Sequence, residues 1–255
     1  MTRRTMPHLA PRSVLLIVLG VLLVTLVLGM EQLAPLFRAW FPDQNPAMYE
    51  RESFLNLTLA HVALVLVSSL ISVGVGVGAG LFVTRPAGRE FAPLVSTLAA
   101  IGQTFPPAAV LAIVVPLAGF GFVPTLVALV LYGLLPVVQN TVAGLGTVPP
   151  QTLEAARGNG MSAWQILWHI ELPLAMRVIV AGVRVSVIIN IGTATIGSTV
   201  GATTLGTPII AGLVGNNLPY VIQGALLVGL LAIVTDLAFE RLERRFSFGA
   251  SGATP

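Results

Sequence analysis

Long uncharged apolar runs constrain the fold of this chain more than any other feature. A helix needs about 20 mostly apolar residues to cross the hydrocarbon core of a bilayer, and runs of that length recur along the sequence. Only 9% of the residues are charged, whereas a soluble domain carries about 25%. Much of the surface must therefore meet lipid, and the sequence predicts an all-α integral membrane protein.

Six apolar segments are predicted to form transmembrane helices. They cover residues 13–30, 55–83, 92–117, 122–143, 179–200 and 219–239. The first follows Arg3, Arg4 and Arg12, as in a signal peptide, but no small-x-small cleavage site closes it. We therefore interpret it as a retained membrane anchor. The polar, aromatic-containing segment 31–53 suits an external loop at the membrane interface.

These spans divide the chain into three regions. Residues 1–54 are expected to form an N-terminal anchor helix and the external loop, and residues 55–245 the main transmembrane domain. Residues 246–255 are expected to be a flexible C-terminal tail.

The distribution of arginine predicts the orientation, because basic residues are enriched on the cytoplasmic side of a membrane. With both termini inside, ten arginines are cytoplasmic: Arg3, Arg4, Arg12, Arg85, Arg89, Arg157, Arg177, Arg241, Arg244 and Arg245. Arg38 and Arg51 are then external, and Arg184 lies within or near the fifth span. The same dispersal at membrane flanks explains the pI of about 10.2 without a nucleic-acid partner.

Alternating glycines in the second span form two small-xxx-small pairs, Gly74/Gly78 and Gly76/Gly80, on different helix faces. Such pairs let helix backbones approach closely. We favour tight packing inside one subunit over a moving or dimeric interface.

The third span is interrupted by Gln103-Thr104-Phe105-Pro106-Pro107. Proline removes backbone hydrogen bonds, and broken helices are tolerated in membranes where they line a cavity or pack inside protein. A translocation path near Gln103 and Thr104 and a packed kink both fit this break. Asn190 and Thr193 in the fifth span are further candidates for the path, although such groups also hydrogen-bond between packed helices.

A polar segment between the fourth and fifth spans, residues 148–173, is predicted to be a hairpin of two short helices. Pro150 suits the first turn of a helix, Gly160 permits a positive φ, and Ser162 can cap a second helix. Trp164, Leu167, Trp168 and Leu172 would give that helix an apolar side against the spans. Pro173 is expected to end the hairpin.

The hairpin carries the pattern Glu-Ala-Ala-x3-Gly-x9-Ile-x-Leu-Pro, which resembles the signature loop of permease subunits in ATP-binding-cassette (ABC) importers. The matching positions are Glu154, Ala155, Ala156, Gly160, Ile170, Leu172 and Pro173. The resemblance implies that these residues dock the permease on a cytoplasmic ATPase. It also implies a type I importer permease with about six transmembrane helices in a bacterial inner membrane.

Further segments are similar to the glycine betaine, choline and carnitine (osmoprotectant) branch of these permeases. They are residues 103–107, 131–136, 181–184, 191–195 and 197–206, the last of which is richer in threonine here. The resemblance implies two ATP-binding subunits, an external solute-binding protein and a second permease copy or paralogue. Methionine and sulfonate or nitrate permeases share the hairpin and remain alternatives.

The chain lacks the residues that several kinds of enzyme and metal site require. Without lysine the chain has no Walker motif, and without cysteine it has no thiolate site. His8, His61 and His169 are scattered, so we predict no metal, cofactor or catalytic residue and no enzyme. An ion-coupled carrier, the alternative class, usually has ionisable groups deep in its spans, where only Arg184 qualifies. No aromatic cluster suits a quaternary ammonium ion, so selectivity is expected in the external binding protein.

The orientation can be tested with reporter fusions. Reporters after Asn159 and Pro255 are expected to be cytoplasmic, and one after Asn45 external, because of the arginine asymmetry. Paired phosphatase and fluorescent-protein fusions measure the side. An external signal from the Asn159 fusion would refute the six-span topology.

Overall fold

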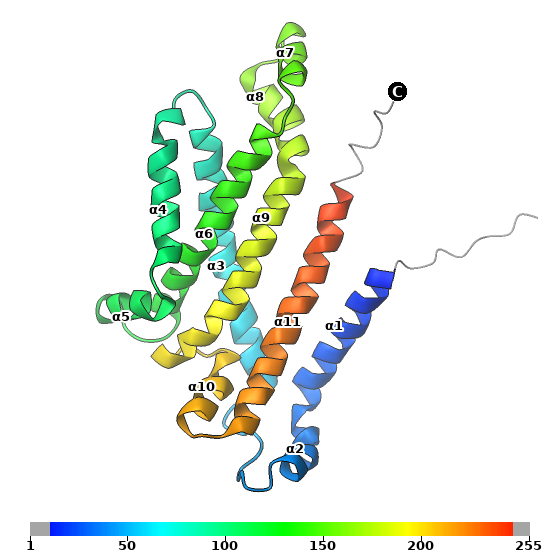
Figure 1. Cartoon of the computed structure of the whole chain (residues 1–255), viewed down its shortest axis with the longest axis vertical. Helices are drawn as coiled ribbons and strands as arrows, with labels where there is room; N and C mark the ends of the chain where they lie inside the picture. Colours follow the sequence, from blue (N-terminus) through cyan, green and yellow to red (C-terminus); the bar gives the residue numbers. More distant parts are fainter. Residues whose placement is uncertain (1–10, 247–255) are drawn as a thin grey trace, which may run out of the picture.

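The structure is a computed structural model that describes residues 11–246, and every regular element in this part of the chain is a helix (Figure 1). The long helices are α1 (Pro11–Gly29), α3 (Phe54–Val83), α6 (Phe122–Gly146), α9 (Leu172–Thr193) and α11 (Leu218–Arg245). The shorter ones are α2 (Ala34–Trp40), α4 (Ala92–Thr104), α5 (Pro107–Ala118), α7 (Pro150–Gly158), α8 (Ala163–Ile166) and α10 (Gly206–Val214). Helical turns are η1 (Met30–Leu33), η2 (Arg89–Phe91), η3 (Leu167–Glu171) and η4 (Ala194–Val200). Arg3, Arg4, His8 and the predicted tail beyond Phe246 lie outside the described residues.

The predicted number of about six spans is confirmed. Five helical segments are long and apolar enough to cross a bilayer, and a bent pair makes a possible sixth. α3, α6 and α11 contain the second, fourth and sixth predicted spans. The first span continues through α2 to Trp40, and the fifth is the second half of a longer helix, Ala163–Val200.

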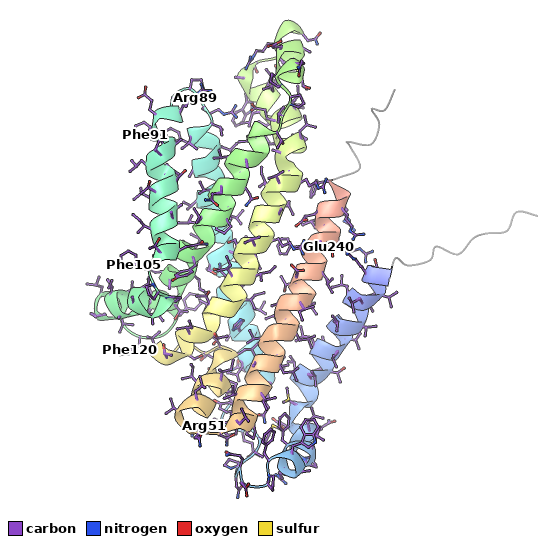
Figure 2. All side chains as sticks on the ribbon, in the orientation of Figure 1. Arg51, Arg89, Phe91, Phe105, Phe120 and Glu240 are labelled. Carbon is purple, nitrogen blue, oxygen red and sulfur yellow. The ribbon has the colours of Figure 1, made fainter. Side chains whose placement is uncertain are left out.

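The third predicted span is two helices rather than one continuous rod. α4 and α5 meet at an angle of 95°, and Phe105 lies at this corner (Figure 2). Phe105 and Pro106 both have extended backbones, with ψ of 135° and 140°, as expected for residues that precede proline. The sequence located the break correctly, but it did not predict that α5 turns away from the bundle axis.

The bundle is built on three helices, α3, α6 and α9, which pack against one another. α4 lies on the outer side of α6, whereas α11 packs on α9 and α1 packs on α11 (Figure 1). The α7–α8 hairpin lies at one end of the bundle, α2 and α10 lie at the other, and α5 crosses the end of α4 that is farther from the hairpin (Figure 1). We call these the hairpin end and the loop end. Apolar side chains on α1, such as Val21 and Leu28, are exposed, as expected for a helix that faces lipid.

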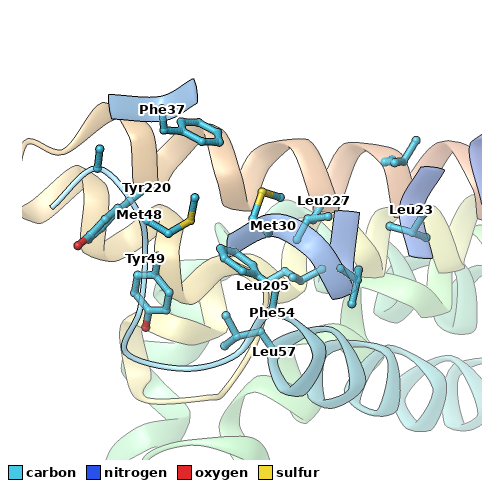
Figure 3. Packing of buried hydrophobic residues seen from close by; sticks show 13 residues of the cluster. Leu23, Met30, Phe37, Met48, Tyr49, Phe54, Leu57, Leu205, Tyr220 and Leu227 are labelled. Atoms are coloured by element: carbon cyan, nitrogen blue, oxygen red, sulfur yellow. The ribbon is translucent and has the colours of Figure 1, made fainter. Parts of the chain in front are cut away.

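The external loop was predicted over residues 31–53, but residues 31–40 are helical, and the remaining residues 41–53 pack closely on α11 at the loop end. Met48 and Tyr49 are buried (Figure 3), and the Tyr49 ring meets the Tyr220 ring edge to face at 5.4 Å. The buried Gln223 side chain accepts a hydrogen bond from the Tyr49 backbone N–H at 3.0 Å and donates one to the Ala47 carbonyl at 2.8 Å. The loop therefore fixes α1 and α2 to α11.

The two glycine pairs of α3 behave differently. A Cβ on Gly76 would lie 2.8 Å from the Val137 Cβ, and one on Gly80 would lie 2.7 Å from the Thr141 Cβ. A Cβ on Gly74 or Gly78 meets no atom within 4 Å. The preference for packing inside one subunit is thus confirmed for Gly76 and Gly80, which let α3 approach α6. Gly74 and Gly78 make no such contact within the described chain.

Matched alanine variants test this difference. Gly76→Ala is expected to destabilise the protein by about 1–3 kcal/mol, because an overpacked contact must shift. Gly78→Ala, the control, is expected to be neutral or to stabilise by about 0.5–1 kcal/mol, because alanine favours the helix. Thermal unfolding in detergent compares them, and equal effects would show that Gly76 is not a packing site.

Candidate functional site

The first helix of the hairpin, α7, begins as predicted. Pro150 occupies its first turn, and Pro149 precedes it without a side-chain cap. Glu154 and Ala155 are exposed, whereas Ala156 is 4% exposed and packs within the chain. Of the Glu-Ala-Ala triplet, only Glu154 and Ala155 therefore present side chains to a partner.

Gly160 has the predicted positive φ, 76°. Its N–H bonds to the Arg157 carbonyl at 2.9 Å, and the Met161 N–H bonds to the Ala156 carbonyl at 3.1 Å. This pair of bonds is the Schellman arrangement, which satisfies the last carbonyls of a helix. A Cβ on Gly160 would meet no atom within 4 Å, so a side chain there costs backbone strain and makes no clash within the chain.

The second helix of the hairpin continues into the fifth span, so the expectation that Pro173 ends the hairpin is wrong. Ser162 caps α8 as predicted, in a capping box with Gln165. The following turn, η3, is π-helical, and the Leu172 N–H bonds to the Leu167 carbonyl five residues earlier. Pro173 lies in the first turn of α9. A π turn adds a residue within a helix, and here the helix passes Pro173 without stopping.

The same π turn changes which side of the helix is buried. Trp164 and Trp168 are 67% and 52% exposed, so the predicted apolar side is wrong for both tryptophans. Their rings pack edge to face at 5.4 Å. Ile166 and Glu171 are buried instead. They are five residues apart, which is the spacing of a π turn and not the spacing assumed from an α-helix.

An ion pair connects the base of the hairpin to α3. Arg85, just beyond the end of α3, donates a hydrogen bond to the Glu171 carboxylate at 2.7 Å, and the Glu171 side chain is only 11% exposed. Around it, Ile170 is half-buried, Leu172 is buried and Pro173 is exposed. Glu171 occupies the variable position of the motif and was not predicted. A carboxylate between apolar residues was the available signal, since buried charges need partners.

Gln103 connects α4 to α6 through a side-chain hydrogen bond. The half-buried Gln103 side chain donates to the Tyr132 carbonyl at 2.8 Å, and the Tyr132 hydroxyl donates to the Phe105 carbonyl. Thr104 is exposed, and its hydroxyl bonds to the Ala100 carbonyl in its own helix at 2.9 Å. The break in the third span is thus fastened by hydrogen bonds to α6.

Asn190 and Thr193, the other two predicted path residues, lie in α9. Asn190 is fully buried, and its amide donates to the hydroxyls of Ser68 and Ser69 in α3 at 3.3 Å each. Thr193 is half-buried near the end of α9, one turn after Ile189, which packs against the cluster around Tyr132. No hydrogen bond within residues 11–246 joins Gln103 or Thr104 to Asn190 or Thr193, and the four stay predicted path residues.

One cavity of the bundle is almost wholly apolar. It measures about 610 Å³, lies between α3, α4, α5 and α6, and is lined by residues such as Val75, Leu98, Phe105 and Leu131. Neither Gln103 nor Thr104 lines it. A charged solute would lose its hydration here without gaining hydrogen-bond partners, so this cavity is unsuited to a polar path.

Two further polar contacts lie in the spans. The Arg184 guanidinium donates to both carboxylate oxygens of Asp236 in α11, at 2.7 Å each, and contacts Glu243 at 3.4 Å. The sequence contained Arg184 and Asp236 as separate charges and did not predict that they pair. His61 is fully buried: Nδ1 accepts from the Leu205 N–H at 3.3 Å, so Nε2 donates to the Ile191 carbonyl at 3.1 Å. It is a packed side chain between α3, α9 and Leu205.

The fold is a bundle of membrane helices with an ordered hairpin at one end, and comparisons with known proteins identify its class as that of transport permeases. The chain matches the model of the binding-protein-dependent transport system inner membrane component over residues 76–248, and it belongs to this family. It is a multi-pass inner-membrane permease subunit of an ABC importer.

Sequence relatives lie in the osmoprotectant branch, which confirms the resemblance noted from the sequence. The chain is 40% identical over 193 residues to the osmoprotectant import permease protein OsmY of Salmonella typhimurium, covering 76% of this chain and 82% of the relative. It is 38% identical to the glycine betaine/carnitine/choline transport system permease protein OpuCB of Bacillus subtilis, covering 72% and 84%. The choline transport system permease protein OpuBB of that organism is also 38% identical, with 74% and 87% covered.

Solved structures confirm the fold. The inward-facing MetNI methionine ABC transporter aligns with a TM-score of 0.68 and 23% identity, covering 76% of this chain and 95% of that one. An amino acid ABC transporter with histidines aligns at 0.62 and 20%, covering 86% and 98%. At these identities the likeness concerns architecture alone.

A double-mutant cycle tests the Arg85–Glu171 pair. Arg85→Gln and Glu171→Gln are each expected to destabilise the protein by about 1–3 kcal/mol, because each leaves a charge without its hydrogen-bond partner. The double variant is expected to cost less than the sum of the two, by about 0.5 kcal/mol or more. Thermal unfolding measures this, with exposed Arg89→Gln as the control. Strictly additive effects would mean that the two side chains do not interact.

Proposed function

We propose that this chain is the permease of an uptake system for glycine betaine, choline, carnitine or a related quaternary ammonium osmoprotectant. The observation that carries the proposal is 37–40% identity, over about three quarters of the chain, to permeases named for osmoprotectant or choline transport. The methionine transporter shares the architecture at only 23% identity. This supports methionine as a substrate far less than the 37–40% identity supports an osmoprotectant.

We propose that the hairpin is the element that docks on a separate cytoplasmic ATPase, with two ATPase subunits in the complete importer. The exposed Glu154 and Ala155 would meet the ATPase. Gly160 supports this role because its positive φ fixes the angle between the two hairpin helices. The Arg85–Glu171 bond would carry a displacement of the hairpin to α3.

A second permease copy, or a paralogue, and an external solute-binding protein complete the proposal. The apolar lining of the 610 Å³ cavity supports a path made between two permeases rather than within one. In that arrangement Gln103, Thr104, Asn190 and Thr193 remain candidates for residues along the path.

The proposed orientation has both termini and the hairpin end in the cytoplasm of a bacterium. The ten-to-two arginine asymmetry supports it. The loop end, with residues 41–53, would then meet the binding protein.

Uptake into proteoliposomes that contain the whole importer tests the substrate class. ATP-dependent accumulation of radiolabelled glycine betaine, choline or carnitine is expected, with methionine as the control solute. Removing the ATPase is expected to abolish uptake. Accumulation of methionine alone would refute the substrate proposal, and undiminished uptake without the ATPase would indicate an ion-coupled carrier.

Variants of the hairpin test the coupling role separately. Gly160→Arg is expected to abolish ATPase recruitment, because a side chain at positive φ costs about 1 kcal/mol of strain and adds bulk at the docking surface. Glu154→Lys is expected to act similarly by reversing a charge. The spans insert through their own hydrophobicity, so membrane levels should stay normal.

A pull-down of the ATPase from detergent, paired with uptake, measures coupling. Glu90→Lys is the matched control, since Glu90 is exposed in the turn after α3 and lies outside the hairpin. If Gly160→Arg and Glu154→Lys both bind the ATPase and transport as the wild type does, the hairpin is not the coupling element.

A further inference from the structure

A charged cleft lies between α9 and α11 at the hairpin end. Its volume is about 310 Å³, and all its lining residues are ionisable: Arg177, Arg184, Glu240, Glu243 and Arg244. The cleft lies apart from the hairpin residues and the proposed path residues. The transport function does not imply a ligand for this cleft. Such a ligand is also independent of which solute is transported.

The two carboxylates of the cleft are already paired. Glu243 contacts Arg184 at 3.4 Å, and Glu240 accepts from Arg244 at 2.7 Å and from Arg12 of α1. Arg177 is exposed, and within residues 11–246 it has neither an ion pair nor a hydrogen bond. The cleft therefore contains one guanidinium whose charge no protein carboxylate neutralises.

The surroundings of the cleft are also basic. The ends of α1, α9 and α11 contribute six arginines but only three carboxylates to this region. The arginines are Arg12, Arg177, Arg184, Arg241, Arg244 and Arg245, and the carboxylates are Asp236, Glu240 and Glu243. The positive potential favours an anion in the cleft, and guanidinium groups match the geometry of a phosphate.

The length of α11 places the cleft at the level of lipid headgroups. With 28 residues the helix is about 42 Å long at roughly 1.5 Å per residue. The hydrocarbon core is only about 30 Å thick. The polar last turns, which include Glu240 (Figure 2) and Arg244, therefore extend into the headgroup layer.

An apolar groove adjoins the charged cleft. It measures about 240 Å³ and lies between α3, α9 and α11, with Val187, Leu231 and Phe239 in its lining. Val187 is one helical turn from Arg184, and Phe239 is one turn from Glu243. Since residues three or four apart are neighbours on a helix surface, the groove begins where the cleft ends.

We propose that this cleft binds the phosphate headgroup of an anionic phospholipid in the leaflet at the hairpin end, with an acyl chain in the adjoining groove. Arg177 is the principal ligand, and Arg184 and Arg244 complete the basic wall. The apolar groove distinguishes a lipid from free phosphate, because only the lipid occupies both volumes.

The experiment uses the complete importer purified in detergent and stripped of lipid. Short-chain phosphatidylglycerol, short-chain phosphatidylcholine and inorganic phosphate are titrated separately, and native mass spectrometry gives the bound fraction. Arg177→Gln is the test variant, since within residues 11–246 its side chain has no hydrogen bond or ion pair to lose. Arg89→Gln is the matched control: Arg89 is also exposed at the hairpin end (Figure 2), but it lies beside α4.

Phosphatidylglycerol is expected to bind the wild type and Arg89→Gln equally. Its dissociation constant is expected to rise about fivefold in Arg177→Gln, the usual contribution of one basic residue near an anionic lipid. Phosphatidylcholine is expected to bind more weakly and to be indifferent to the variant. Equal affinity of the two lipids, or no change in Arg177→Gln, would overturn the proposal. Displacement of the lipid by equimolar inorganic phosphate would assign the site to free phosphate instead.

Discussion

Close backbone contact between α6 and its two neighbours is the constraint on which the rest of the structure depends. A Cβ on Gly182 of α9 would lie 2.4 Å from the Asn140 Cβ, and one on Gly133 would lie 2.7 Å from the hydroxyls of Ser72 and Ser186. Together with Gly76 and Gly80, these glycines bring three helices within contact where lipid supplies no hydrophobic drive for association. Any side chain at these positions would move α3 or α9 away from α6, and α6 and α9 are the helices that the hairpin connects.

The two ends of this core are fastened by different chemistry. At the hairpin end, ion pairs join α1 to α11 and α3 to the base of the hairpin, through Arg12 and Arg85 and their carboxylates, and Arg184 joins α9 to α11 within the spans. At the loop end, neutral groups do so, with His61 between α3 and α9 and Gln223 between α11 and the loop. Charged side chains are tolerable near the headgroups, where water and lipid phosphates share in their solvation, but are costly at depth. Neutral hydrogen bonds suit the buried positions.

The sequence predicted the features that depend on neighbouring residues in the chain. Span positions follow from local apolar length, and the caps at Ser162 and Gly160 follow from the chemistry of single turns. Contacts between distant segments could not be predicted from the sequence. Nothing in the residues around Arg184 or Glu171 indicates that Asp236 and Arg85 are their partners. The prediction that Trp164 and Trp168 lie on the buried side of their helix was wrong, because it assumed the α-helical period where the chain forms a π turn. The 95° angle between α4 and α5 was not predicted, because two prolines indicate a break in a helix but not its direction. Here the direction is set by packing against α6.

The continuous helix from the hairpin to the loop end has a mechanical consequence. It contains 38 residues, Ala163–Val200, about 57 Å at roughly 1.5 Å per residue. Gly182, at one of its close contacts with α6, lies almost at its midpoint, and Gly197, at another, lies near its end. A rod that tilts about its centre moves its two ends equally and in opposite directions. A push at Ala163 toward the bundle axis would thus swing Val200 away from the axis and draw Gly197 away from Thr125 of α6.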